Sequence, residues 1–479
     1  MNGWIPKVTV HTLIIVISLL IYVLTTRLER TRRPPSIAIA WVLSLIALPY
    51  FALPAYLIFG RRKLRRKTAH RSGTQQGGLN WAEELIESFG LAASAPAFVR
   101  LHRDGVDSSA ALFATMASAR SRLDICTYIL GNDAIGREAT RYMVERARAG
   151  VRVRLLIDGV GAIKLPRSCF HEWQQAGIET AVFSPLFARR TPAPRNLRNH
   201  RKLTIADGVR LWAGGRNLAA EYFVGGNGVP AWRDLTFDLD GPVAAAATDQ
   251  FEADWVAAGG NPAISTEACA TADASVAADA PAAASVPAGV TDPSDTLIEA
   301  APCRAQFVPS GPDQAEDTVQ ALLIDACFRA RRRIIAVTPY FVPDAALEMA
   351  MRLAARRGVR IDLCIPATSN HRLPDFVRHR ALRSLSEVGA RVHLSPYMNH
   401  AKAVVFDRSL AVSGSVNLDS RSLLLNFECA VVFYGVDEID WLANWIQDLI
   451  PESRPYDCRA PGLWRDIAEG LLLTVAYQL

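Results

Sequence analysis

Two long apolar segments occur near the start of the chain. Residues 8–25 are mostly apolar, and residues 37–59 form a stretch of 23 positions without a charge. Either is long enough to cross a bilayer as a helix, which takes about 20 residues. Pro49 and Pro54 would kink the second helix, which a membrane helix tolerates when neighbours satisfy the freed carbonyls. Because no small-x-small cleavage site follows the first segment, the pattern favours a transmembrane hairpin within residues 1–71 over a signal peptide.

Beyond the hairpin the pattern changes to β-branched strands that alternate with amphipathic helices, and it does so twice. Residues 145–158, ERARAGVRVRLLID, resemble residues 353–366, LAARRGVRIDLCIP. Each stretch has a basic helix end, a glycine in C-cap position and then a strand. This internal repeat predicts an α/β fold of two similar lobes, each with a mixed β-sheet flanked by helices.

The repeat places the first lobe at residues 72–258 and the second at residues 301–479. Residues 259–300, between them, are rich in alanine and proline and contain few large apolar side chains. Such a segment cannot bury enough surface to offset the entropy of ordering it. We expect a flexible linker; an alanine-rich helix is the alternative, and the repeated prolines and glycines disfavour it.

The candidate chemistry is a His-x-Lys-x4-Asp motif that occurs once in each lobe. Each motif lies in an apolar run that alternates like a buried strand, so its histidine and lysine project from the same face. A glycine-containing turn and an asparagine follow each motif and can return an amide to that face. The residues are His200, Lys202, Asp207 and Asn217 in the first lobe, and His400, Lys402, Asp407 and Asn417 in the second.

These residue types match the needs of phosphodiester displacement. That reaction requires a nucleophile that can hold the phosphoryl group, an acid for the leaving alkoxide, and positive charge on the non-bridging oxygens. Imidazole suits the first two roles because its ordinary pKa is about 6.5. Two histidines, two lysines and two asparagines supply all three needs without a metal or other cofactor. We expect the aspartates to orient a ring or a lysine rather than to attack.

One such motif alone would be weak evidence, since a single strand histidine is usually structural. The paired motifs, each followed by a GG-x-N or GS-x-N turn, resemble the phospholipase D superfamily. The stretches WRDLTFDLDGPV, TPYFVPD and GSVNLDSRSLLLNFE narrow this resemblance to the bacterial cardiolipin synthases. The resemblance covers almost the whole chain apart from roughly the first 30 residues and the segment between the lobes.

This resemblance implies a reaction and further site residues. It implies transfer of a phosphatidyl group from one phosphatidylglycerol to another, which gives cardiolipin and glycerol through a phosphatidyl-histidine intermediate. It also implies that Arg421, Ser422 and Glu428 line the site, with Glu428 tethering the ring of the opposing histidine. We expect His200 to attack and His400 to act as the acid, although the two halves are chemically equivalent in sequence. A hydrolase that releases phosphatidic acid and a non-enzymatic membrane scaffold remain as alternatives.

Charge separates the N-terminal segment from the lobes. The first 71 residues carry a net charge of +11 and the whole chain +6, which leaves residues 72–479 at about −5. Nucleic-acid binding generally needs a basic face, so this balance disfavours a nuclease of the same superfamily. The run RRKLRRK at residues 61–67 fits anionic lipid headgroups or a positive-inside signal. We therefore expect a multi-pass protein of the bacterial inner membrane, with its lobes on the cytoplasmic side.

Two smaller features bear on the site. Residues 188–202, ARRTPAPRNLRNHRK, contain five arginines and no acid. This stretch could bind a lipid headgroup or a second phosphate near the reacting one, or it could be a solvated loop.

The eight cysteines show no CxxC spacing, which agrees with a reducing compartment and argues against a zinc site. The sequence does not indicate an oligomeric state.

Overall fold

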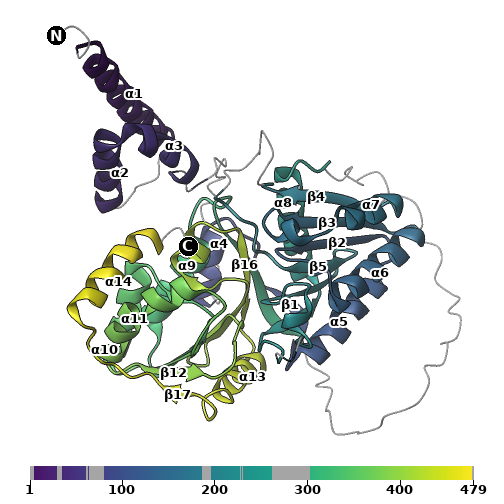
Figure 1. Ribbon diagram of the computed structural model, residues 1–479. Coiled ribbons are helices and arrows are strands. Elements are labelled where there is room, and N and C mark those ends of the chain that lie inside the picture. Colours follow the sequence, from purple (N-terminus) through teal and green to yellow (C-terminus); the bar gives the residue numbers. More distant parts are fainter. Residues whose placement is uncertain are drawn as a thin grey trace, which may run out of the picture.

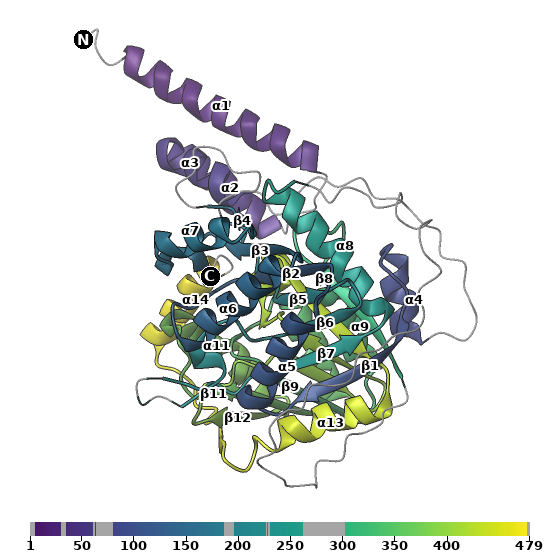
Figure 2. The ribbon, with the colours of Figure 1, turned by 90° about the vertical axis from the view of Figure 1, so that its right-hand side faces the viewer.

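The computed structural model describes residues 5–29, 35–60, 63, 80–185, 196–226, 228, 230–261 and 302–476. Its N-terminal part forms three helices, which stand apart from the sheet in Figure 1; Figure 2 shows the first helix along the outer side of the other two. A small core of Tyr22, Leu45, Ala52 and Tyr56 holds these helices together. Their bounds are Ile5–Glu29 for α1, Pro35–Ala47 for α2 and Pro49–Phe59 for α3.

The expectation of one continuous helix over residues 37–59 is wrong. Leu48 leaves the helical conformation, with φ −137° and ψ 58°, and Pro49 begins a new helix. The cause is local, because a proline disfavours the α conformation of the residue before it and is well suited to the first position of a helix. The predicted two-span hairpin is not supported either: no helix in the described part of the chain is both long and apolar enough to cross a membrane.

The first lobe follows the predicted alternation of strands and helices. After α4 (Trp81–Ser88), its elements are β1 (Ala95–His102), α5 (Gly105–Ser118), β2 (Arg122–Thr127), α6 (Ala134–Arg148), β3 (Arg152–Asp158), η1 (Gly161–Lys164), α7 (Arg167–Gln175), β4 (Glu179–Phe183), β5 (Leu203–Ala206), β6 (Arg210–Gly214), η2 (Ala220–Tyr222), β7 (Thr236–Asp240) and α8 (Pro242–Ala257). The predicted linker lies outside the described residues from residue 262 onward.

The second lobe repeats this order. Its elements are β8 (Cys303–Ser310), α9 (Thr318–Arg329), β9 (Arg333–Val337), β10 (Phe341–Val342), α10 (Ala345–Arg356), β11 (Arg360–Pro366), α11 (Arg372–Ser386), β12 (Arg391–Ser395), β13 (Ala403–Phe406), β14 (Leu410–Gly414), β15 (Leu418–Asp419), α12 (Ser420–Leu424), β16 (Glu428–Phe433), α13 (Val436–Gln447), β17 (Arg454–Pro455) and α14 (Leu463–Ala476).

The sheets of the two lobes join into one sheet of 15 strands, which the sequence did not predict. Its order is β17-β12-β11-β9-β13-β14-β16-β8-β1-β7-β6-β5-β2-β3-β4. The first strand of each lobe forms the junction, since β1 pairs antiparallel with β8 in a register that places Ala95 opposite Ala305. Outward from this junction the strands of one lobe match those of the other, apart from the added edge strand β17. The mixed sheet in each of two repeated lobes is confirmed.

Helices cover both faces of the sheet, so its strands are buried on both sides. In the first lobe, Ile125 and Leu155 pack in the core under α5 and α6, whereas their neighbours Cys126 and Leu156 pack in the core shared with the second lobe. Figure 1 shows α5 and α6 along one side of the first-lobe strands. The ring pair Phe237–Phe433, at 5.3 Å between centroids, continues the shared core across the lobe boundary. The lobes therefore form one packed body.

A buried arginine links the two lobes at the level of the motifs. Arg201 lies between the first motif's histidine and lysine and is fully buried. Its Nη1 donates to Asp254 of α8 at 2.5 Å, and its Nη2 donates to Asp313 at 3.0 Å. Its Nε donates to the carbonyl of Glu428 at 2.9 Å. The motif segment of the first lobe is thus tied to two chain segments of the second.

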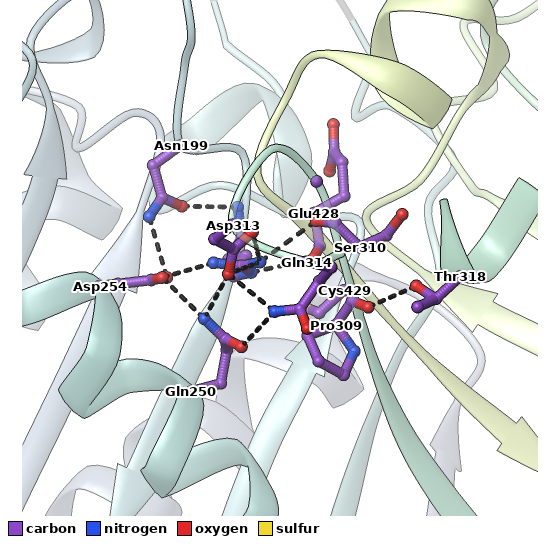
Figure 3. Close-up of polar contacts among 12 residues, drawn as sticks. Asn199, Gln250, Asp254, Pro309, Ser310, Asp313, Gln314, Thr318, Glu428 and Cys429 are labelled. Atoms are coloured by element: carbon purple, nitrogen blue, oxygen red, sulfur yellow. Dashed lines mark hydrogen bonds and ion pairs between the residues drawn. The ribbon is translucent and has the colours of Figure 1, made fainter. Parts of the chain in front are cut away.

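Amide side chains complete this network, as Figure 3 shows. Gln250 donates to both Asp254 and Asp313, at 2.8 and 3.0 Å. Asn199 donates to Asp254 at 3.0 Å, and Gln314 donates to Asp313 at 2.8 Å. Buried carboxylates are tolerated only when they are paired and hydrogen-bonded, and both carboxylates here meet that condition.

Replacing Arg201 with methionine is expected to destabilise the fold strongly. The change removes the cation that compensates two buried carboxylates, and breaking a buried pair in this way costs about 3–5 kcal/mol. Denaturant unfolding followed by tryptophan fluorescence measures the loss. Arg408→Met, which removes an exposed ion pair with Asp440, is the matched control and should change little. Equal unfolding midpoints for the two variants would contradict the assigned role of Arg201.

Candidate active site

Each motif segment is held by the opposite lobe. His200 and Lys202 lie in an extended segment just before β5, and His400 and Lys402 lie just before β13. The backbone N–H of His200 donates to the carbonyl of Phe427 at 2.8 Å, and that of His400 donates to the carbonyl of Arg233 at 2.6 Å. The sequence placed these residues within strands; they precede the strands because their backbone groups pair across the lobe boundary.

The motif side chains converge on one cavity of about 570 Å³ between the lobes. Arg201 points away into the buried network, so the histidine and lysine at alternate positions share a face, as the sequence predicted. Arg421 and Ser422 also line this cavity. The motif residues along its wall are His200, Lys202, Asn217, His400, Lys402 and Asn417.

The structure does not bring Asp207 and Asp407 into this cavity. Both lie at the far ends of β5 and β13 with positive φ, 54° and 53°. Asp207 accepts hydrogen bonds from the backbone N–H groups of residues 120, 121 and 122, and Asp407 accepts from those of residues 331, 332 and 333. The expectation that they orient a ring or a lysine is therefore contradicted, because these carboxylates fix the start of β2 and β9.

A carboxylate from the opposite lobe faces the ring of each motif histidine. Oδ2 of Asp234 lies 2.7 Å from Nδ1 of His400, and Oε1 of Glu428 lies 3.7 Å from Nδ1 of His200. Glu428 was among the site residues that the resemblance implied, whereas Asp234 was not among the predicted site residues. The internal repeat contains the signal that could have found it, because each acid stands seven residues before a glycine, Gly241 or Gly435, that precedes a helix.

The turns after the motifs explain why the two acids differ. A Cβ atom at Gly215 would lie 2.1 Å from Oδ1 of Asp234, so only glycine leaves room for this carboxylate. The equivalent residue in the second lobe is Ser415, whose hydroxyl donates to Oε2 of Glu428 at 2.5 Å. Asp234 therefore lies close to His400. Glu428 is held by Ser415 and lies farther from His200.

The two acids also differ in protonation. Burial alone would raise the pKa of Asp234, but the nearby charges of Lys402 and His400 hold that pKa at about 2. Burial raises the pKa of Glu428 to about 7, against the opposing effect of Lys202 and the hydrogen bond from Ser415. At neutral pH one ring therefore faces a fixed negative charge, and the other faces a carboxyl group that is partly protonated.

The cations of the site are destabilised by burial. Burial and the charge of Lys402 lower the pKa of His400 to about 4, although Asp234 opposes the change. Burial, Lys202 and Arg421 lower the pKa of His200 well below its ordinary value. The Nζ of Lys402 lies 2.6 Å from Nδ1 of His400, and burial lowers the pKa of this lysine to about 7. An anionic substrate would relieve this excess of positive charge, which favours phosphate binding.

Aromatic and polar neighbours fix the rings and the amides. The ring of Tyr128 packs on that of His200 with centroids 4.0 Å apart, and Tyr222 meets the ring of His400 edge-on at 5.0 Å. Asn217 donates to the hydroxyl of Tyr222 at 2.8 Å, whereas Asn417 donates to the hydroxyl of Ser422 at 3.1 Å. The side chain of Asn417 also contacts Asp419, so the two amides differ in their surroundings.

Two facing histidine-lysine pairs in a cavity between repeated α/β lobes define the phospholipase D superfamily. The family model described as "Cardiolipin synthase, PLD-like domain" matches residues 112–255 and 323–450, more than half of the chain. A second model, "Phospholipase_D-nuclease N-terminal", matches residues 14–61. The chain belongs to the cardiolipin synthase family of phospholipase D-like proteins, which confirms the resemblance drawn from the motifs.

Individual relatives agree with this assignment. Cardiolipin synthase A of Pseudomonas putida (strain W619) is 31% identical over 447 residues, which cover 87% of each chain. Cardiolipin synthase A of Pseudomonas aeruginosa (strain LESB58) is 30% identical over 476 residues, which cover 92% of this chain and 91% of the relative. The crystal structure of phosphatidylserine synthase from Haemophilus influenzae Rd KW20 shares the fold, with a TM-score of 0.58 at 12% identity over 83% of this chain and 99% of that one.

Replacing Asp234 with asparagine is expected to lower turnover by about 10²- to 10⁴-fold, because His400 loses the charge that stabilises its protonated form. Product formation per folded molecule measures the effect. Asp207→Asn is the matched control: it should lose about 1–2 kcal/mol of folding free energy through weaker backbone hydrogen bonds, with near-normal turnover. Equal loss of turnover in the two variants would contradict the assignment of Asp234 to the site and of Asp207 to the fold.

Replacing Glu428 with glutamine is expected to have a pH-dependent effect on stability. The pKa of Glu428 is about 7 in the folded protein and about 4.3 in an unfolded chain, so its ionisation destabilises the fold as pH rises through this window. Glutamine does not ionise, so the variant does not lose stability in this way, although Lys202 then has no carboxylate beside it. Its Tm relative to the wild type should therefore rise by a few degrees between about pH 5 and about pH 8. A difference that stays constant across this window would show that Glu428 does not titrate there.

Proposed function

We propose that the chain is a cardiolipin synthase that joins two phosphatidylglycerol molecules into cardiolipin and releases glycerol. The observation that carries this proposal is the pair of facing imidazoles, each backed by an acid of the opposite lobe, with the pKa values of the two acids displaced in opposite directions. Such a division separates a nucleophile from a general acid within one site. The family assignment supports the same enzyme class, a phosphatidyltransferase.

In the first step the Nε2 of His200 attacks the phosphorus of the donor lipid. His200 suits this role because 24% of its side chain is exposed, against 10% for His400, and because Glu428 stabilises its protonated form only weakly. As the new N–P bond forms, the P–O bond to glycerol breaks. The negative charge of the bound phosphate joins that of Asp234 in stabilising protonated His400, which delivers its proton to the leaving oxygen.

In the second step His400 is neutral and acts as a base. It removes the proton from a hydroxyl of the acceptor phosphatidylglycerol, whose oxygen then attacks the phosphorus as the N–P bond to His200 breaks. Cardiolipin leaves and His400 is protonated again for the next cycle. Lys202 and Lys402 stabilise the negative charge on the phosphoryl oxygens in both steps, and the amides of Asn217 and Asn417, which line the same cavity, assist them.

We also propose that the enzyme acts at the bacterial inner membrane, with its lobes on the cytoplasmic side. The substrate is a lipid, and the N-terminal helices expose large apolar side chains such as Leu13, Leu43 and Phe51. Exposed apolar surface of this kind suits contact with a membrane. The basic run at residues 61–67 suits the anionic headgroups, although only Lys63 of this run is among the described residues.

Product analysis tests the proposed reaction. Membranes that contain the wild-type chain and labelled phosphatidylglycerol should yield cardiolipin and free glycerol in equal amounts. Membranes with His200→Ala or His400→Ala should yield neither, and mass analysis of trapped protein should find the phosphatidyl group on His200. Phosphatidic acid as the only product would make the chain a hydrolase, and no turnover would favour a scaffold. An intermediate on His400 would reverse the two roles.

A further inference from the structure

The proposed reaction places a requirement on the cavity that the motif residues do not meet. The acceptor phosphatidylglycerol carries a phosphodiester of its own, one three-carbon bridge away from the hydroxyl that attacks. Two anionic groups must therefore be bound at once, a short distance apart. Lys202 and Lys402 face the reacting phosphorus, so a second group of cations is needed for the acceptor.

Two arginines from opposite lobes line the same cavity beside His200. Arg421 belongs to α12, and Arg198 lies in the segment that leads to the first motif. Arg421 donates to the carbonyl of Asn196 at 2.7 Å, which brings the helix of the second lobe against that segment. The carbonyl of Arg198 accepts from the N–H of Phe427 at 2.9 Å. These contacts fix the two guanidinium groups at one end of the cavity.

Arg198 is held rigidly in this position. It is 4% exposed, and its Nη1 contacts Asp158 at 3.2 Å and donates to the carbonyl of Ser184 at 3.0 Å. Arg421 is less buried and presents part of its side chain to the cavity. One cation is thus fixed by the fold, and the other can adjust to a ligand.

The electrostatics at this end of the cavity favour an anion. Burial lowers the pKa of Arg421, and Arg198 contributes to the lowering by repulsion, against the opposing effect of Asp419, Tyr128 and Asp158. Arg421 in turn contributes to the low pKa of His200. The Nη1 and Nη2 atoms of Arg198 already donate to Asp158 and Ser184. A phosphate here therefore takes its hydrogen bonds mainly from Arg421, and Arg198 adds positive charge beside it.

We propose that Arg198 and Arg421 form a second phosphate subsite, which binds the phosphodiester of the acceptor lipid while His200 carries the phosphatidyl group. This inference rests on the proposed function and adds to it the feature that selects a phospholipid acceptor over an alcohol or water. An acceptor without a phosphate gains nothing from the subsite. The ratio of the product from a phospholipid acceptor to the product from an alcohol acceptor therefore measures the contribution of the subsite.

Arg421→Gln is the variant of choice, because glutamine retains a donor for the Asn196 carbonyl, whereas a change at Arg198 would leave buried Asp158 without its cation. The wild type and the variant are given phosphatidylglycerol vesicles in the presence of deuterated glycerol. Attack by phosphatidylglycerol gives cardiolipin, and attack by deuterated glycerol gives labelled phosphatidylglycerol from the same intermediate. The two acceptors share a glycerol hydroxyl and differ in the phosphate and its lipid.

The ratio of cardiolipin to labelled phosphatidylglycerol is expected to fall about tenfold in Arg421→Gln, which is the effect of losing one charge-assisted hydrogen bond. Arg421→Lys, which keeps the charge, should recover part of the ratio. Arg408→Gln changes an exposed arginine that pairs with Asp440 and does not line the cavity, and it should match the wild type.

Two outcomes would overturn the subsite. If both products fall in parallel, so that the ratio stays at the wild-type value, Arg421 acts on the donor phosphate or on the fold. If Arg421→Lys behaves like Arg421→Gln with an unchanged ratio, charge at this position has no bearing on the acceptor. The proposed function fails in a different way, since the wild type itself would then form no cardiolipin in the assay.

Discussion

The arrangement of the site depends on one buried arginine. Arg201 stands between the two side chains of the first motif that line the cavity, and it binds groups of α8, the loop after β8 and the start of β16. Alternate residues of an extended chain face opposite ways. In the segment from His200 to Lys202, the outer two side chains therefore face the cavity and the middle one, Arg201, anchors the lobes. The position of His200 and that of Glu428 are therefore set by one network.

Chemical asymmetry follows from small differences at equivalent positions. The two motifs are alike, and the acids that back them occupy matching places at the start of β7 and β16. Gly215 lets a short aspartate approach its ring, whereas Ser415 holds a longer glutamate at a distance. The pKa of Asp234 is about 2 and that of Glu428 is about 7, so at neutral pH one histidine faces a full negative charge and the other faces a partly protonated carboxyl group. No difference between the motif residues themselves is needed.

The sequence was informative where a pattern repeats and uninformative where contacts cross between distant segments. The lobes, the sheet type, and the shared face of His200 and Lys202 follow from periodicity and from two motif copies. Asp234 was not predicted because it meets His400 only when the two lobes pack together. Asp207 was assigned to the site wrongly because it lies in the hairpin turn after β5, away from the cavity. The break at Leu48 depends on one proline, whose effect on the preceding residue outweighs the apolar pattern around it.

The pairing of β1 with β8 has a consequence for how such a site can be asymmetric. Antiparallel pairing of matching edge strands is the contact that two identical subunits would make about a two-fold axis, and each subunit would then give its acid to the other's histidine. Identical subunits would supply the same acid twice, and the two rings would be equivalent. With both halves in one covalent chain, each position is encoded separately, so one half can carry a glycine and an aspartate while the other carries a serine and a glutamate. Fusion of the halves is what permits the two histidines to have different acids beside them.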